Sequence, residues 1–240
     1  MSEWWTYRPS DFLMFAPRTY WRLFELHNTA WWPAPPWLVL AGGVVLALLW
    51  CQRKNVPAGW LRGMAALLAL GWAFSGWAFV AQRYAPINWA AEGLALACAV
   101  PALVLAALAL PDCPLQAAAS ARYRAGLLLL GWAVVGHPLL APIFDRPLLQ
   151  AEVWMLAPDP TAVATLGWLL AVQPGARHAR WLCALAWTAT VAWCAVSAAT
   201  LWTMGSAQGW VVAGLAVAAV GTRVATQRAP GAPAAGSASP

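Results

Sequence analysis

Seven long apolar stretches dominate this chain and leave almost no polar sequence with which to build a water-soluble surface. Hydrophobic residues make up 62% of its 240 residues and charged residues 9%, whereas soluble domains carry about 25% charged residues. A helix needs about 20 predominantly apolar residues to cross the hydrocarbon core of a bilayer. The predicted spans are residues 37–51, 61–81, 89–110, 125–143, 158–173, 181–203 and 209–225.

These spans are predicted to be helices. Isolated strands cannot satisfy their backbone groups in lipid, and segments rich in Ala, Leu and Trp lack the short alternation of barrel strands. The sequence therefore predicts an all-α, polytopic transmembrane helical bundle of about seven spans within residues 34–227. Residues 228–240 are rich in Ala, Pro, Gly and Ser, which predicts a disordered tail. The short segment 158–173 leaves open whether it crosses the membrane fully.

The linkers alternate between basic and less basic, and this alternation predicts the orientation. Nine Lys and Arg residues fall on one side and five on the other. The positive-inside rule places the richer side in the cytoplasm, so the N-terminus is predicted to be outside and the C-terminus inside. Seven of the eight acidic residues then fall on the outer side. The nine basic residues are Arg53, Lys54, Arg62, Arg122, Arg124, Arg177, Arg180, Arg223 and Arg228.

Residues 1–33 form a separate N-terminal segment that is rich in aromatic residues. From Pro17 onward, charged and aromatic side chains fall on different faces of a helix, which predicts an amphipathic helix lying in the outer membrane interface. Two roles stay open for it. It either anchors the chain, or it forms a lid over a cavity with Arg18, Arg22 and Glu25 as the lid residues.

Three stretches of the sequence carry a family resemblance. MSEWWTYRPSDFLMFAPRTYWRLFELHN, RYAPINWAAE and AEVWMLAPDPTAVATLG resemble an uncharacterised family of bacterial multi-pass membrane proteins, domain of unknown function 6064. The resemblance covers nearly the whole chain short of its tail. It implies an integral protein of the bacterial inner membrane with no assigned activity and no known catalytic residues.

The first candidate site residues lie between the second and third spans, in RYAPINWAAEG. Pro86 and Asn88 indicate a tight turn, and Glu92 follows close to a helix N-terminus, where the macrodipole favours negative charge. Arg83 is near enough in sequence to pair with Glu92. Two interpretations stay open: an ion pair that stabilises the helix start, or a carboxylate facing a polar vestibule, because ionisable groups at membrane depth usually face the bundle interior.

The fourth span is interrupted by proline, in GHPLLAPIFDRP. Pro138 and Pro142 each remove a backbone donor and obstruct the preceding turn. The outer half of this span is therefore predicted to be kinked or unwound, with His137 at the break. Asp145 and Arg146 close the span.

An acidic outer loop follows the broken span. Residues 147–156 predict a short interfacial helix that carries Gln150 and Glu152, and Asp159 with Pro160 predicts an N-cap and first-turn proline for the next helix. Half-helices with exposed ends form the binding sites of transporters, although proline kinks also occur in ordinary membrane helices. Both interpretations stay open.

A stripe of small, weakly polar residues follows the sixth span at steps of three, four and seven. It indicates close helix packing with hydroxyls bonded to their own backbone, and a cavity wall is the alternative. The GxxxG pattern of Gly205–Gly209 lies in a loop and indicates only a turn. The stripe contains Cys183, Thr190, Cys194, Ser197 and Met204.

The sequence thus predicts an inner-membrane protein that binds a small polar solute or ion in an outward-facing vestibule, for transport or sensing. The alternative is a non-catalytic membrane partner or accessory subunit of a larger complex, or a homo-oligomer, whose outer polar groups merely pair with each other. The predicted vestibule residues are Arg83, Asn88, Glu92, His137, Asp145, Arg146, Glu152 and Asp159.

Enzymatic activity is disfavoured. The chain contains no HExxH, P-loop, dinucleotide fingerprint or GxSxG elbow; for an enzyme, Glu92, His137 and Asp145 would be the acid–base candidates. No spacing supports a metal site, and no cofactor is predicted. The net charge of +6 is attributed to loops facing an anionic membrane surface, so the lipid bilayer is an expected partner and nucleic acid is not.

Overall fold

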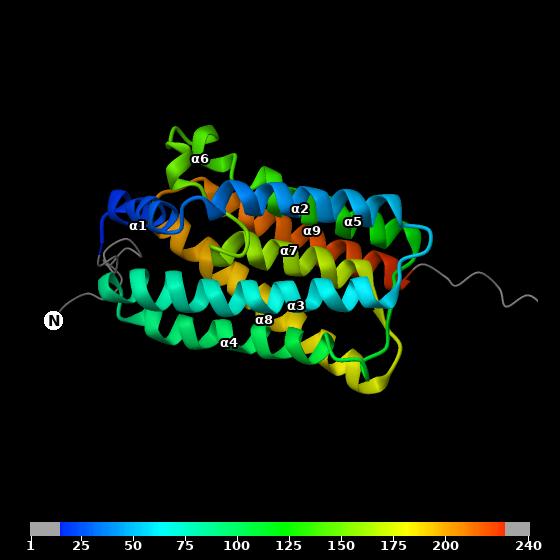
Figure 1. Ribbon diagram of the computed structural model, residues 1–240. Helices are drawn as coiled ribbons and strands as arrows, with labels where there is room; N and C mark the ends of the chain where they lie inside the picture. Colours follow the sequence, from blue (N-terminus) through cyan, green and yellow to red (C-terminus); the bar gives the residue numbers. More distant parts are fainter. Residues whose placement is uncertain (1–14, 229–240) are drawn as a thin grey trace, which may run out of the picture.

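The computed structural model describes residues 15–228, and this part of the chain forms one elongated bundle of helices that run roughly parallel or antiparallel to each other (Figure 1). The predicted tail, beyond Arg228, and residues 1–14 of the N-terminal segment lie outside the described residues. Regular β structure within residues 15–228 is limited to β1 (Leu115–Ala117), which pairs antiparallel with β2 (Val172–Pro174). The all-α prediction is confirmed.

Five helices among residues 15–228 are long and apolar enough to cross a membrane, which indicates a multi-pass membrane protein. The second of them continues without a break from α3 through the π-helix η3 and the 3₁₀ turn η4. These helices are α2 (Ala34–Cys51), α3 (Ala58–Phe74) with η3 (Ser75–Tyr84) and η4 (Ala85–Ile87), α4 (Ala90–Leu108), α8 (Arg177–Thr203) and α9 (Gln208–Arg228).

The other two predicted spans are also helical, but they are shorter or interrupted. The fourth consists of α5 (Ser120–Gly131), the π-helix η5 (Trp132–Gly136), a turn at 137–139 and the one-turn α6 (Leu140–Ile143). The interruption coincides with Pro138, as the sequence predicts. The fifth is α7 (Pro158–Ala171), with 14 residues, or about 21 Å of helix.

The short helix α7 forms the centre of the bundle. Every one of its residues is buried, and it packs against α3, α5, α8 and α9. A helix that is apolar on all sides is stable when it is surrounded by protein. Its C-terminal carbonyl groups are satisfied by Arg122, whose guanidinium donates to the oxygens of Leu170 and Val172. The chain can therefore leave the helix inside the protein without exposing unpaired backbone groups to lipid.

The contact of α7 with α5 depends on two glycines. A Cβ atom placed on Gly126 would lie 2.4 Å from the carbonyl oxygen of Gly167, and one placed on Gly167 would lie 2.7 Å from the carbonyl oxygen of Gly126. The two backbones thus approach so closely that only glycine fits at either position. Close approach of helix backbones through small residues is typical of membrane bundles.

The two ends of the bundle differ in chemistry. One end carries α1 (Pro17–Ala30), the region around α6 and the start of α9; the other carries the β1–β2 pair (Figure 1). The linkers at the β1–β2 end are those that contain or adjoin the basic residues counted above, from Arg53 to Arg228. The acidic residues Glu152 and Asp159 lie toward the α1 end, because Asn28 of α1 binds the carbonyl oxygen of Ala151 and Tyr20 of α1 lines the same pocket as Asp159.

Candidate functional site

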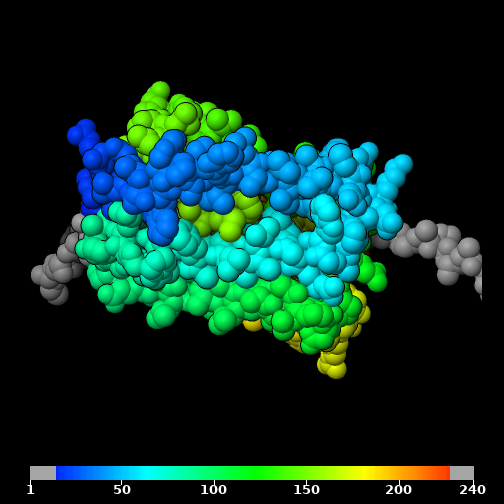
Figure 2. All heavy atoms as spheres, viewed as in Figure 1, coloured from blue at the N-terminus to red at the C-terminus, as the bar shows by residue number. Residues whose placement is uncertain are grey.

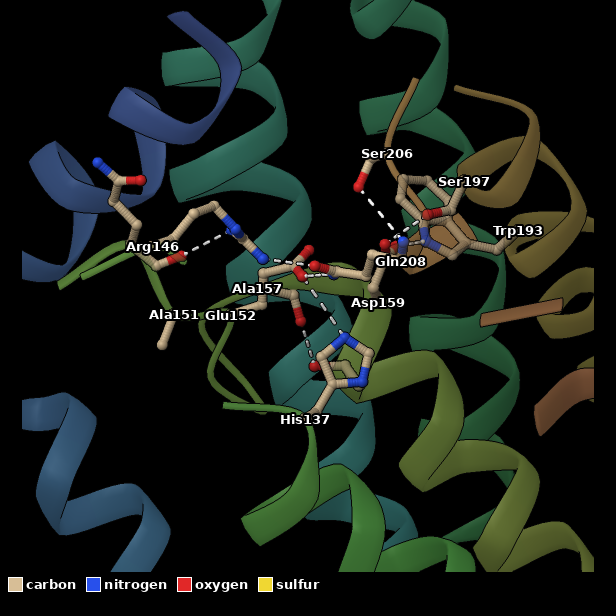
Figure 3. A network of polar contacts seen from close by, with 12 residues as sticks. His137, Arg146, Ala151, Glu152, Ala157, Asp159, Trp193, Ser197, Ser206 and Gln208 are labelled. Carbon is tan, nitrogen blue, oxygen red and sulfur yellow. Dashed lines mark hydrogen bonds and ion pairs between the residues drawn. The ribbon is translucent and has the colours of Figure 1, made fainter. Parts of the chain in front are cut away.

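A network of buried polar side chains lies inside the bundle near its α1 end (Figure 3). At its centre, the Nε2 atom of His137 lies 3.6 Å from Oε2 of Glu152. His137 is 0% exposed and Glu152 2% exposed. Because burying an ionised group is costly unless it has partners, the remaining contacts of this pair determine what the site can do.

Arg146 balances the charge of Glu152 through a bridging amide. The guanidinium of Arg146 donates to the side-chain oxygen of Gln208, and the side-chain nitrogen of Gln208 donates to Oε2 of Glu152. Gln208 is the first residue of α9 and is fully buried. The guanidinium carbon of Arg146 also lies 3.4 Å from the ring centroid of Trp21 on α1, a cation–π contact. The α1 helix therefore closes this side of the network.

A second carboxylate, that of Asp159, lies in the first turn of α7. It is 3% exposed. One oxygen accepts a hydrogen bond of 2.9 Å from Nε1 of Trp193, and the other accepts one from the hydroxyl of Ser197. Both donors lie on α8. Asp159 therefore does not form the N-cap that the sequence predicts; the N-cap position is Ala157, and the aspartate side chain binds the neighbouring helix instead.

The space beside Asp159 is very small. A cavity of about 30 Å³ is lined by Tyr20, Asp159 and Ser197 together with apolar side chains of η3 and α8, and a single water takes up about that volume. In the space-filling view, α1, α2 and the segment around α6 lie against one another at this end of the molecule (Figure 2). The network side chains are thus buried, and the pocket that the described residues form at Asp159 is narrow.

The local sequence explains how His137 and Glu152 reach the interior. His137 follows the π-helix η5 directly, at the break caused by Pro138, and π-helical turns are frequent at functional sites. The segment after Gln150 is not the interfacial helix that the sequence predicts. One 3₁₀ turn, η6 (Leu148–Gln150), is followed by a buried, non-helical segment that enters the bundle.

Asn28 on α1 holds this segment in place. Its side-chain nitrogen donates 2.8 Å hydrogen bonds to the carbonyl oxygens of Leu149 and Ala151. Residues 147–156 therefore gain more by burying Val153 and Trp154, which are 4% and 2% exposed, than by forming a surface helix. Only a non-helical path through the bundle places Glu152 beside His137.

Several buried polar atoms of the network have no hydrogen-bond partner among the described residues. They are both ring nitrogens of His137, Oε1 of Glu152 and Nε1 of the neighbouring Trp132. Buried polar groups are normally satisfied. The network is therefore only partly paired, and His137 has free hydrogen-bonding capacity at a fully buried position.

The polar groups outside the spanning segments have pKa values that reflect this burial. Burial opposes ionisation of Glu152, but the nearby His137, together with Arg146 and Gln208, outweighs it and lowers the pKa of this carboxyl group. Burial lowers the pKa of Arg146. Burial, followed by the charges of Asp159 and Glu152, raises the pKa of Tyr20 well above its usual value. Glu152 is thus held ionised at neutral pH.

The structure brings together four of the eight predicted vestibule residues: His137, Arg146, Glu152 and Asp159. The other four do not join them. Asp145, next to Arg146 in the chain, is exposed and has a positive φ of 54°. Arg83, Asn88 and Glu92 lie around the turn between η3 and α4.

The predicted pairing of Arg83 with Glu92 is absent. Among residues 15–228, Arg22 pairs with Glu25, and His137 lies within ion-pair distance of Glu152 and would pair with it if protonated. Glu92 is exposed and borders an apolar groove between η3 and α4. Asn88 is occupied locally, since its side chain donates to the hydroxyl of Tyr84 and its oxygen accepts from the backbone N–H of Ala90. Proximity in the sequence did not bring these groups to the bundle interior.

The charged residues predicted to form a lid lie on the outer face of α1. Arg18 is exposed, and Arg22 pairs with Glu25 three residues along the helix. Glu25 also accepts a 3.1 Å hydrogen bond from Gln150, and this bond, followed by Arg22, lowers its pKa. The face of α1 that covers the network is aromatic instead, through Tyr20, Trp21 and Phe24. The lid prediction for Arg18, Arg22 and Glu25 is thus corrected: only Glu25 reaches the loop that leads to the network.

Sequence reasoning missed four residues of this site. Ser197 is interpreted above as a packing residue, and Gln208 falls within a predicted turn; Trp21 and Trp193 receive no role. The signal for Ser197 is its place in the weakly polar stripe of the sixth span, four residues after Trp193 and therefore on the same helix face. Gln208 has no comparable signal, because nothing in the sequence shows that a loop glutamine enters the core.

Comparisons with known proteins return no match: no protein-family model fits the chain, and neither a curated protein nor a solved structure is similar to it. The resemblance to domain of unknown function 6064 therefore stays a prediction. The site has to be interpreted from its own geometry.

Proposed function

We propose that this chain is a seven-span protein of the bacterial inner membrane, with its N-terminus outside, that binds a small polar solute or ion for transport or sensing. In this proposal α5 with its broken continuation and the central helix α7 complete the seven spans, and α1 lies at the outer interface. The proposed family membership is consistent with such a location.

One observation carries the proposal: an incompletely paired set of ionisable groups lies buried within an apolar bundle. His137, Glu152 and Asp159 are all within 3% of full burial, and both ring nitrogens of His137 and Oε1 of Glu152 have no hydrogen-bond partner among the described residues. Ionisable residues inside a membrane bundle are costly and generally mark a solute or ion pathway. A purely structural cluster would be expected to satisfy its buried atoms.

The same geometry changes the expected form of the site. The vestibule that the sequence predicts to be open is closed here by α1 and by residues 144–157, and the cavity at Asp159 has room for about one water. In this proposal, access from outside requires the segment after His137 to move. This segment joins a π-helix to a proline-broken turn, so it would lose few regular helical hydrogen bonds by moving.

The alternative, an accessory membrane partner, explains the apolar exterior equally well. It predicts that the outer polar groups exist only to pair with each other. The pairing of Arg146, Gln208 and Glu152 fits that expectation, but the free nitrogens of His137 do not. Ligand binding accounts for both observations.

A binding screen on the purified protein in detergent tests the proposal. Thermal unfolding is measured against a panel of inorganic ions, amino acids and small organic anions for the wild type, Glu152→Gln and the matched control Glu92→Gln. Binding at the network predicts a rise in Tm with at least one compound, retained in Glu92→Gln and lost in Glu152→Gln. The absence of any shift, or a shift that both variants keep, would contradict a ligand site at Glu152.

A further inference from the structure

The buried network is not electrically balanced. Arg146 and Glu152 compensate each other through Gln208. The carboxylate of Asp159 adds a further negative charge, and a neutral His137 adds none. An unprotonated network therefore carries a net charge of −1 at a buried position, and an uncompensated buried charge is costly.

The surroundings offer no other compensation. Aromatic hydroxyls, thiols and neutral amides line the neighbouring elements, and Arg146 is the only cation that the described residues contribute. The titratable and charged groups facing the network are Tyr20 from α1, Tyr84 from η3, Cys98 from α4, Arg146 and Glu152 from residues 144–157, Asp159 from α7 and Cys194 from α8.

A metal ion or organic cation fits this site poorly. The guanidinium of Arg146 and the amide nitrogen of Gln208 already occupy the approach to Glu152, and both would repel a cation. The cavity beside Asp159 measures about 30 Å³. No group of three or more His, Cys, Asp or Glu side chains within residues 15–228 is arranged to hold a metal. A proton needs neither a cavity nor a ligand cage.

The hydrogen bonds indicate which group receives the proton. Both oxygens of Asp159 accept hydrogen bonds, from Trp193 and Ser197, and donors of this kind favour the ionised carboxylate. Oε2 of Glu152 accepts from Gln208. The ring nitrogens of His137 have no partners, and Nε2 lies 3.6 Å from Glu152. An imidazolium there would gain a carboxylate partner at once.

We propose that the ligand of this network is a single proton, which binds to a ring nitrogen of His137 and makes the network electrically neutral. The inference rests on the proposed function and names its ion. The proton comes from water on the α1 side and forms an N–H bond with a lone pair of the imidazole. No electron is transferred and no other bond is broken. Release of the proton restores the charge of −1.

The test is nitrogen NMR of the full chain in nanodiscs, labelled with ¹⁵N-histidine, from about pH 5 to about pH 8, the range in which histidine side chains ordinarily titrate. His137→Asn assigns the His137 signals by their loss. The inference predicts that His137 takes up one proton as the pH falls. It also predicts that Asp159→Asn, which removes the excess negative charge without changing shape, keeps His137 neutral throughout. The control Glu92→Gln should leave the titration unchanged.

The outcomes separate this inference from the proposed function. A His137 that stays neutral in the wild type, or that titrates identically in Asp159→Asn, overturns the proton assignment. If the thermal screen nevertheless shows a ligand whose effect is lost in Glu152→Gln, solute binding stands without the proton. If Asp159→Asn fails to fold, Ser197→Ala provides the second variant. Without this donor Asp159 competes with His137 for the proton, so His137 should be protonated only at lower pH, and an unchanged His137 titration contradicts the inference.

Discussion

The Nε2 atom of His137 lies 3.6 Å from Oε2 of Glu152, although the two residues are separated by a broken helix, a turn and a non-helical segment. The separation is short enough for an ion pair and too long for a good hydrogen bond. The attraction between His137 and Glu152 therefore depends on whether His137 carries a charge. The first prediction tests how much the fold depends on it.

Glu152→Gln should destabilise the protein by about 2 kcal/mol, because the substitution leaves Arg146 without its carboxylate while keeping the size of the side chain; hydrogen bonds to charged groups are worth about 1.5–3 kcal/mol. Thermal unfolding in detergent measures the effect. Glu92→Gln, at an exposed carboxylate, should leave Tm nearly unchanged. Equal effects of the two substitutions would contradict a special role for the buried pair.

Gly126→Ala should cost about 2 kcal/mol, within the range for overpacking a tight contact. The added methyl group would meet the carbonyl oxygen of Gly167 at 2.4 Å, and a helix backbone cannot move aside easily. Gly93→Ala is the matched control, because no atom lies within 4 Å of its Cβ position; alanine is there expected to be neutral or stabilising. Thermal unfolding of both variants tests the prediction, and a Tm of Gly126→Ala as high as that of Gly93→Ala would contradict it.

Stability should fall as pH decreases from about 6.5 to about 4, in part through His27 on α1. Burial, followed by the charge of Arg83, lowers the pKa of His27 to about 4, whereas an unfolded histidine titrates near 6.5. The unfolded state therefore binds the proton first, and the stabilising effect is complete above pH 6.5 and lost as the pH falls through the folded pKa. Each pKa unit corresponds to about 1.4 kcal/mol, so the effect is at most about 3.5 kcal/mol.

His27→Phe tests this dependence, because phenylalanine keeps the aromatic packing against Phe79 and Phe74 and cannot be protonated. The slope of Tm against pH should become shallower in this range. His178→Phe, at an exposed histidine, should keep the wild-type slope. A wild-type slope in His27→Phe would show that the acid sensitivity arises elsewhere.

Trp193→Phe should lower stability by about 1–2 kcal/mol, since it removes the 2.9 Å hydrogen bond to Asp159 and leaves one oxygen of a buried carboxylate without a donor. Trp181→Phe is the control, because Trp181 lies on the same helix and is 68% exposed. Chemical or thermal unfolding of both variants gives the comparison. A loss no greater than that of Trp181→Phe would argue against a charged Asp159.

The proposed orientation makes a prediction of its own. A green fluorescent protein fused after residue 240 should fluoresce, and a periplasmic alkaline phosphatase at the same position should be inactive, because the C-terminus is placed in the cytoplasm by the positive-inside rule. The opposite result would invert the bundle and move the network of His137 and Glu152 to the cytoplasmic side.

Much of the fold follows from the sequence because apolar segments can be identified from short stretches of residues. Each predicted span, from 37–51 to 209–225, overlaps helix, since a run of apolar residues in lipid has few alternatives to the helix. The fourth is interrupted at 137–139, and residues 172 and 173 of the fifth belong to β2. The break at Pro138 follows in the same way from the missing backbone donor. The short length of residues 158–173 is also visible in the sequence, and it marks the one helix that the bundle surrounds completely.

The site was predictable only in part. His137, Arg146, Glu152 and Asp159 were identifiable as ionisable groups at the outer ends of spans. Their partners were not. Gln208 comes 56 residues after Glu152, and Ser197 comes 38 residues after Asp159, so these contacts depend on how whole helices pack. The same reason explains why the prediction for Glu92 failed. Its position near a helix N-terminus suggested a carboxylate facing the bundle interior, but the side chain is exposed.

By itself, the sequence determined that this chain is helical, apolar enough to belong in a membrane, and different in charge at its two ends, because each of these properties depends on composition over a few turns of helix. The tertiary structure decided which polar groups meet. Residues 151–157 form a buried non-helical segment rather than a surface helix. Asn28 donates hydrogen bonds to the carbonyl oxygens at its start, and most of its side chains are buried in the bundle. That choice, which depends on contacts over 120 residues apart in the chain, places Glu152 against His137.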